Sequence, residues 1–157
     1  MRKIAQLSAA IFVILVGSPG YSQNWTAEQQ EVIDDLEACW DLWVEALDDR
    51  TPDAWANDCA EEDYTYWFRG AAPGGLEDLR REWSIIRETR EYWIGLHPIS
   101  IKIFGDIAIM HFVGIWSGLG PEGRIINEAN RTEVFRRDDG QWKIVAGHNQ
   151  TTNDRYY

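Results

Sequence analysis

Residues 130–150 read NRTEVFRRDDGQWKIVAGHNQ, and this stretch decides the fold. Two runs rich in β-branched and aromatic residues flank an Asp-Asp-Gly turn, which is the pattern of a β-hairpin. The second run ends near His148, one of three histidines in the chain. The function depends on whether this hairpin closes a ligand pocket or is a wall without chemistry.

Similar runs recur upstream of the hairpin and predict further strands. The five expected strands are residues 64–68, 99–104, 107–116, 126–137 and 142–150. Gly105-Asp106 predicts a tight turn between the second and third of them, and residues 118–123 predict a longer loop before the fourth.

Helices are expected ahead of most strands. Thr26 opens the first with a capping-box pattern, and this helix runs to about Leu47. Its apolar positions recur at helical spacing: Val32, Leu36, Cys39, Trp40, Trp43 and Leu47. Pro52 opens a short second helix that runs through Cys59, and a third helix begins near Leu76. Helices followed by a strand meander predict an α+β fold, with the helices packed on one face of a curved, largely antiparallel sheet.

Residues 1–22 have the pattern of a secretory signal peptide. Two basic residues precede an apolar run from Ile4 to Gly17, and small residues follow up to Ser22. The apolar run is shorter than the roughly 20 residues that a membrane span needs. We therefore expect a secreted or periplasmic protein, with residues 23–157 as a single domain that has no membrane attachment after cleavage.

Composition excludes some classes of partner. Loss of Arg2 and Lys3 with the signal takes the formal net charge from −11 to −13, which repels nucleic-acid backbones. Nine tryptophans, six tyrosines and five phenylalanines fit either a thick core or an aromatic-lined cavity. No two histidines have metal-ligand spacing, so we expect no metal and no cofactor.

Cys39 and Cys59 are the only cysteines. Export would place them where a disulfide persists, and this favours a bridge between the two helices. The alternative is two buried thiols that act as small hydrophobic side chains.

Two stretches together resemble a known superfamily. They are YTYWFRGAAPGGLEDL, residues 64–79, and the hairpin NRTEVFRRDDGQWKIVAGHNQ. The chain from Trp25 to Thr152 resembles the nuclear-transport-factor-2-like (NTF2-like) superfamily, within it the SnoaL-like family, and also the association domain of calcium/calmodulin-dependent kinase II. This resemblance implies a cone-shaped α+β fold of the cystatin-like kind, whose N-terminal helices pack on the concave face of the sheet. It also implies a small-molecule pocket and a homodimer through the outer face of the sheet.

The chain departs from these relatives at chemically important positions. The relatives' final strand ends in His-x-His, but here the first histidine is Ala146. Residues 64–69 lack the aspartate base of the ketosteroid isomerase branch. The kinase domain's pocket arginines are replaced by Glu133 and Asn149. The resemblance therefore implies the fold more strongly than any one activity.

The turn geometry decides which residues share a face with His148. A two-residue turn at Asp139-Gly140 places Arg131 opposite His148, whereas a three-residue loop with a bulge places Asn130 there. If the pairing of the two strands shifts by one residue, all the side chains of one strand move to the opposite face of the sheet. Asp139 directly before Gly140 slightly favours the three-residue loop with a bulge. In that version the face away from His148 carries Arg131, Glu133, Val145, Gly147 and Asn149.

Glu133 is the leading candidate for catalysis because it interrupts a strand that must pack on at least one side. In an aromatic cavity its pKa would be raised, and it could act as general acid or base with His148 or Tyr66. The alternative is a salt bridge to Arg131 or Arg137, which would lower the pKa. The candidate ligand-binding residues, for which core packing is the competing interpretation, are Tyr66, Trp93, Met110, Phe112, Trp116, Arg131 and Asn149.

Three functions fit this pattern. The first is an exported SnoaL-like protein that binds a small hydrophobic or amphipathic molecule in an aromatic-lined pocket. The second is a cofactor-free lyase or isomerase that uses Glu133 with His148 or Tyr66. The third is a hub module that binds no ligand.

Overall fold

A computed structural model describes residues 23–49, 53–68, 74–85 and 89–156. The signal-peptide prediction, residues 1–22, and the helix-opening Pro52 lie outside these ranges. In chain order the described elements are α1 (Ala27–Asp49), α2 (Asp53–Cys59), β1 (Ala60–Phe68), α3 (Leu76–Ile85), β2 (Arg90–Phe104), β3 (Ile107–Gly120), β4 (Gly123–Asp138) and β5 (Gln141–Tyr156). None of these helices is long and apolar enough to cross a membrane.

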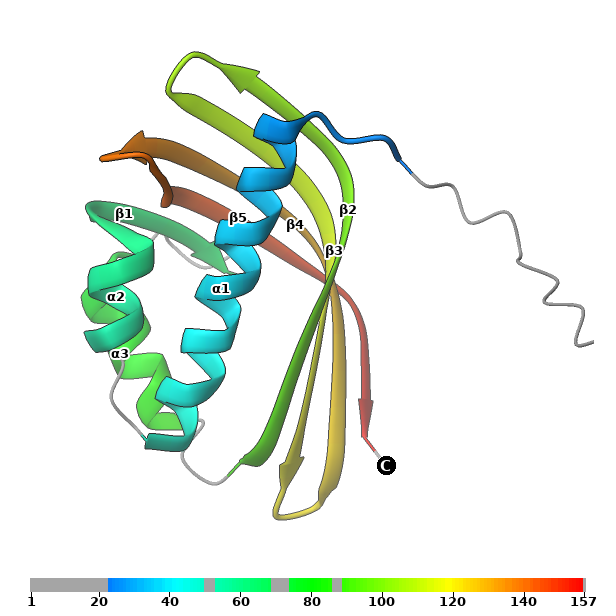
Figure 1. The fold of residues 1–157 in the computed structure, drawn as a ribbon. Coiled ribbons are helices and arrows are strands. Elements are labelled where there is room, and N and C mark those ends of the chain that lie inside the picture. The colour runs from blue at the N-terminus through cyan, green and yellow to red at the C-terminus, as the bar shows by residue number, and fades with distance from the viewer. Residues whose placement is uncertain (1–22, 50–52, 69–73, 86–88, 157) are drawn as a thin grey trace, which may run out of the picture.

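The strands form one mixed sheet in the order β1-β5-β4-β3-β2. Strands β2 to β5 are an antiparallel meander, and β1 joins the edge of β5 in parallel. Figure 1 shows the sheet curving around the helices, which lie on one side of it. We call the side that faces α1 the concave face and the other side the convex face. The predicted α+β architecture is confirmed.

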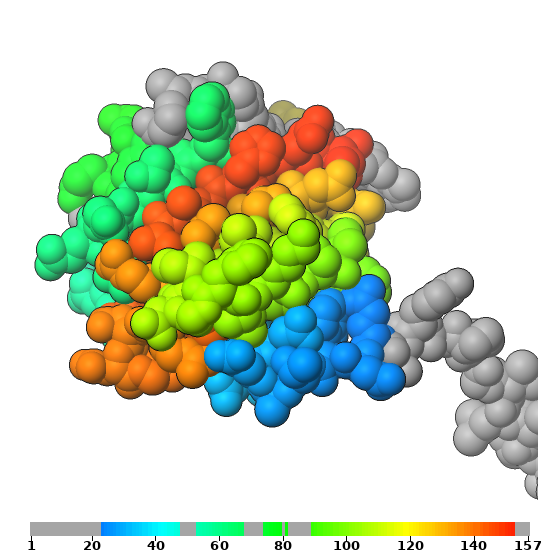
Figure 2. All heavy atoms as spheres, turned by 90° about the horizontal axis from the view of Figure 1, so that it is seen from above, coloured from blue at the N-terminus to red at the C-terminus, as the bar shows by residue number. Residues whose placement is uncertain are grey.

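Helix α1 is fixed to the sheet from its first turn. The predicted capping box forms, because the Thr26 amide donates to Gln29 Oε1 at 3.0 Å and the Gln29 amide donates to Thr26 Oγ1 at 3.2 Å. The Gln29 side chain also donates to the Ile101 carbonyl of β2 at 2.9 Å. Seen from above, the start of α1 (blue) lies beside the β2–β3 hairpin (Figure 2).

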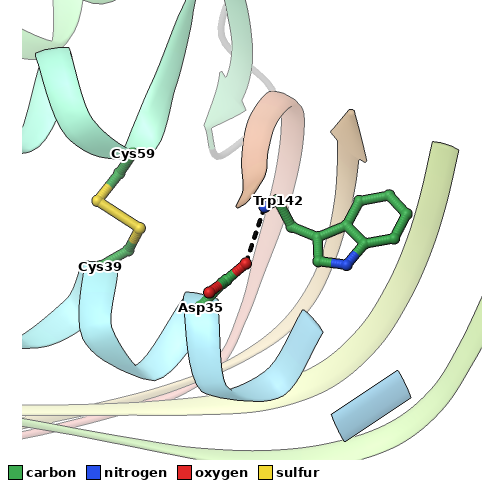
Figure 3. Close-up of a disulfide and its surroundings, with 4 residues drawn as sticks. All are labelled: Asp35, Cys39, Cys59 and Trp142. Carbon is green, nitrogen blue, oxygen red and sulfur yellow. Dashed lines mark hydrogen bonds between the residues drawn. A yellow bond between two sulfur atoms is a disulfide. The ribbon is translucent and has the colours of Figure 1, made fainter. Parts of the chain in front are cut away.

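The other side of α1 is held by the β4–β5 turn. Arg137 donates to Glu28 at 3.0 Å and to Glu31 at 3.2 Å, and its guanidinium lies 4.4 Å from the centre of the Trp142 ring. The Trp142 amide donates to the Asp35 carboxylate at 2.8 Å (Figure 3). These contacts engage Arg137 with α1, away from Glu133.

A disulfide joins the helical layer. Cys39 of α1 and Cys59 at the end of α2 are bridged, with Cα atoms 5.6 Å apart and a separation of 20 residues (Figure 3). A loop of this length constrains the unfolded chain by about 3 kcal/mol in the chain-entropy model. Because α2 runs directly into β1, the bridge also fixes the edge strand that carries Tyr66.

Several strands are longer than the sequence predicts. Strand β2 begins at Arg90, nine residues before the expected start, because its edge position and a register shift between Pro98 and Ser100 accommodate the proline. The longer loop expected at residues 118–123 is wrong. Gly120 pairs with Gly123, so β3 and β4 continue to a tight turn.

The final hairpin combines features of both predicted registers. Asp138 pairs with Gln141, and Asp139 and Gly140 both have positive φ, so the turn has two residues and the favoured three-residue loop is wrong. A bulge then leaves Val145 without a directly paired partner on β4, because Val134 pairs with Ala146 and Phe135 with Ile144. After Val145, Gly147 and Asn149 lie on the same face as Glu133 and Arg131, as the version with a bulge predicted.

Candidate functional site

Two rows of residues cross the concave face beneath α1. They are defined by the pairing of neighbouring strands, since directly paired residues lie on the same face. The first row is Tyr66, Gly147, Glu133, Met110 and Ile101. The second row includes Asn149, Arg131, Phe112 and Pro98. The rows bring three polar side chains together in an otherwise apolar and aromatic surface.

Glu133 lies in the middle of β4 and is only 4% exposed. Its Oε1 lies 3.8 Å from Arg131 Nη1, an ion pair that is longer than a hydrogen bond. Its Oε2 is buried and has no hydrogen-bond partner among the described residues. Burial raises the pKa of Glu133 to about 7, and the opposing effect of Arg131 is smaller. The side chain is therefore a buried carboxyl poised between its two protonation states near neutral pH.

Arg131 lies between this carboxyl and an aromatic wall. Its guanidinium is 5.2 Å from the centre of the Trp40 ring, and Trp40 in turn contacts Phe112 with ring centres 5.5 Å apart. A Cβ at Gly114 would come within 3.0 Å of both Arg131 Nε and Trp40, so glycine provides the space for this stack. Arg131 Nε is buried and lacks a hydrogen-bond partner in the part of the chain that the structure describes.

Asn149 completes the group from β5. It pairs directly with Arg131, is 2% exposed, and its Oδ1 has no partner within the described ranges. We call Glu133, Arg131 and Asn149 the polar floor. A buried polar atom without a hydrogen bond costs about 1–3 kcal/mol, so three in adjacent side chains need an explanation.

The polar floor is closed from solvent in this conformation, since its three unpartnered atoms have almost no exposed area. Arg131 is the floor residue best able to move, because a quarter of its side chain is exposed and its ion pair with Glu133 is 3.8 Å long. A molecule that reaches Glu133 must therefore displace Arg131 or a neighbouring side chain.

Tyr66 forms one side of the floor. A Cβ at Gly147 would lie 2.8 Å from the Tyr66 ring and 3.6 Å from Glu133 Cγ, so the tyrosine ring rests on the glycine beside the carboxyl. Tyr64 stacks on Tyr66 with ring centres 6.0 Å apart. Among the other predicted lining residues, Met110 and Phe112 are buried in the core, and Trp116 packs against it and against Tyr92.

Two of the predicted site residues do not lie on the concave face. His148 is exposed on the convex face, where it pairs with Thr132 and Trp67. The alternation of side chains along β5 turns it away from Glu133, so it cannot assist that carboxyl directly. Trp93 is 55% exposed and lies over Gly95, whereas its neighbour Tyr92 is buried. It does not line the concave face.

Sequence reasoning missed Trp40 and Gly114 as parts of the site, and it placed Gly147 on the face of Glu133 without a role. Trp40 was visible only as one member of the apolar stripe of α1. The two glycines have no side chain to signal a role, and only the close approach of Arg131 and Tyr66 reveals it. Within the described ranges, no group of three His, Cys, Asp or Glu side chains could hold a metal ion.

No protein-family model and no curated protein matches this sequence. Solved structures do match. A scytalone dehydratase-like protein from Novosphingobium aromaticivorans superposes with a TM-score of 0.67 at 18% identity, covering 80% of this chain and 87% of the other. An NTF2-like protein from Cytophaga hutchinsonii has a TM-score of 0.57 at 17% identity, covering 76% and 97%. This protein has the NTF2-like fold.

A third NTF2-like neighbour is the hexachlorocyclohexane dehydrochlorinase LinA-type3 from Novosphingobium barchaimii. Its TM-score is 0.64 at 16% identity, and the match covers 83% of this chain and 90% of the other. The fold expected from the resemblance is thus confirmed, including the curved sheet with helices on its concave face. At these identities the comparison shows the fold alone, so function must be argued from the polar floor.

Proposed function

We propose that the concave face binds a small hydrophobic or amphipathic molecule, with the polar floor holding its polar end. The observation that carries this proposal is that three of the six buried side-chain polar atoms without partners in the described part of the chain lie together: Glu133 Oε2, Arg131 Nε and Asn149 Oδ1. A core built only for stability would pair such atoms or replace them with apolar ones. Apolar and aromatic residues around a few convergent polar groups are the usual composition of a ligand site.

A cofactor-free lyase or isomerase is the second candidate. It is favoured by Glu133, because burial raises the pKa of this carboxyl to about 7, where it can both take and return a proton. Two of the neighbours carry names of elimination enzymes, a dehydratase and a dehydrochlorinase. In this reaction Glu133 would remove a proton beside the leaving group, and Tyr66 is the remaining candidate partner on the same face.

Export and dimerisation belong to the same proposal. Residues 1–22 would direct the chain to a secreted or periplasmic location, and Edman sequencing of the mature protein would then begin near Gln23. An intact Met1 on cytoplasmic protein would contradict export. The exposed apolar residues of the sheet, Trp67 on β1 and Trp93, Ile99 and Phe104 on β2, would be covered in a homodimer. A monomer mass by light scattering at micromolar concentration would contradict the dimer.

Native mass spectrometry of gently purified protein tests the binding function. We expect a bound small molecule on the wild-type protein and its loss in Asn149→Leu, which removes one floor atom at similar volume. Gln150→Leu is the matched control, because Gln150 is the next residue and is exposed on the convex face. Wild-type protein that is empty in repeated preparations, or equal occupancy in both variants, would contradict the proposal.

A further inference from the structure

We propose that the polar floor recognises an uncharged head group that donates two hydrogen bonds and accepts one, as a primary carboxamide does. This inference rests on the proposed binding function and specifies the chemical class of the ligand. It follows from the hydrogen-bonding capacity of three atoms and from the charges that surround them.

The three unpartnered atoms define a simple complement. Glu133 Oε2 and Asn149 Oδ1 are acceptors, and Arg131 Nε is a donor. They come from adjacent positions, since Arg131 pairs directly with Asn149 and Glu133 lies two residues along β4 on the same face. A group with two N–H donors and one carbonyl acceptor can satisfy all three. An ester or ether has no donor and leaves both acceptors unsatisfied.

The charges around the floor disfavour an ionic head group. Arg131 and the ionised Glu133 form a pair with no net charge. The groups that face Glu133 from the packed strands are uncharged at neutral pH: Tyr66 from β1, Gly147 and Asn149 from β5, and Met110 from β3. Trp40 contributes an aromatic ring from α1. At about pH 8, where Glu133 is mostly ionised, a carboxylate would face the Glu133 anion and an ammonium would face Arg131. Among the described residues that face the floor, neither head group would meet a second countercharge.

The surrounding rings favour a flat apolar body behind this head group. Trp40 and Phe112 are in ring contact, and Tyr66 lies across the floor on Gly147. Suitable probes therefore share one planar aromatic body and differ only in their head group. Cinnamamide has two donors and one acceptor, methyl cinnamate has no donor, and cinnamate is an anion.

The experiment measures binding of the three probes to the full mature protein by calorimetry at about pH 8, where Glu133 is mostly ionised. We expect cinnamamide to bind at least about tenfold more tightly than either of the others, because hydrogen bonds to charged groups are the stronger kind. The Glu133→Gln variant should bind cinnamamide and cinnamate with similar affinity. Glu128→Gln is the matched control, because Glu128 lies on the same strand but is exposed on the convex face.

A second measurement needs no variant. In wild-type protein, the Glu133 carboxyl carbon is titrated by NMR with and without each probe. Donors to the carboxylate favour its ionised form, so cinnamamide should lower the pKa of Glu133, whereas cinnamate should raise it. Opposite shifts for the two probes support the assignment even if Glu133→Gln does not fold.

The outcomes separate this inference from the function on which it rests. If methyl cinnamate or cinnamate binds as tightly as cinnamamide at the floor, the head-group class is overturned and small-molecule binding stands. If none of the probes shifts the Glu133 or Asn149 side-chain signals up to its solubility limit, the head-group class is overturned. An empty wild-type protein in the mass-spectrometry experiment would in addition overturn the binding function.

Discussion

The concave and convex faces of the sheet place the same residue types in opposite environments. Glu133 and Glu128 lie on one strand, five residues apart, yet Glu133 is buried with a pKa raised to about 7, while Glu128 is exposed. The chain likewise presents Asn149 to the concave face and its neighbours His148 and Gln150 to the convex face. Strand parity, more than residue type, therefore decides which side chains can carry chemistry.

The largest expected difference between the faces concerns packing. Phe112 is 1% exposed and in contact with Trp40, so Phe112→Ala should cost about 3–5 kcal/mol of unfolding free energy. Val113→Ala, the next residue on the convex face, should cost about 1 kcal/mol. Urea denaturation of both variants measures the difference. Equal losses would contradict the difference in packing between the two faces.

The next effect is the dependence of stability on pH. The pKa of Glu133 is about 7 when folded against 4.5 ordinarily, so the folded protein binds this proton more tightly. The resulting stabilisation is complete below pH 4.5 and is lost as the pH rises through 7. Glutamine does not titrate, so Glu133→Gln lacks this dependence on pH. Between pH 5 and pH 8 the unfolding free energy of the wild type should therefore fall by about 2 kcal/mol relative to that of the variant. Glu128→Gln should follow the wild type, and parallel curves for all three proteins would contradict the account.

The smallest expected effect is at His148. Because it is exposed on the convex face, His148→Ala should change stability by less than about 0.5 kcal/mol and leave ligand occupancy unchanged. Native mass spectrometry and urea denaturation check both expectations. A loss of bound ligand in His148→Ala, with Gln150→Leu as the control, would place the functional face on the other side of the sheet.

Much of the fold could be predicted from local pattern. The capping box at Thr26, the helical stripe of α1 and a hairpin around the Asp-Asp-Gly sequence are short-range signals, and each appears in the structure, although the favoured three-residue loop does not. The interruption of a strand by Glu133 was also visible, since a mid-strand carboxylate is unusual wherever it is buried.

The composition of the site could not be predicted in the same way. One bulged residue, Val145, resets the faces of β5, and nothing in the sequence Ile-Val-Ala-Gly distinguishes a bulge from a regular strand. The parallel pairing that brings Tyr66 onto Gly147 joins residues about 80 positions apart, beyond any local signal. The favoured register already placed His148 on the face away from Glu133, as the structure does. The face of Trp93 could not be predicted, because it depends on a register shift between Arg90 and Trp93 in the pairing of β2 with β3.

Burial, more than the ion pair with Arg131, determines the pKa of Glu133. Carbon-detected NMR titration of labelled glutamate side chains, with Glu133→Gln to assign the signal and Glu128 as an internal comparison, tests it most directly. We expect a titration midpoint near 7 for Glu133, well above the ordinary 4.5. A midpoint below 4.5 would show that Arg131 dominates, and would make Glu133 a salt-bridged wall residue instead of the reactive centre of a polar floor.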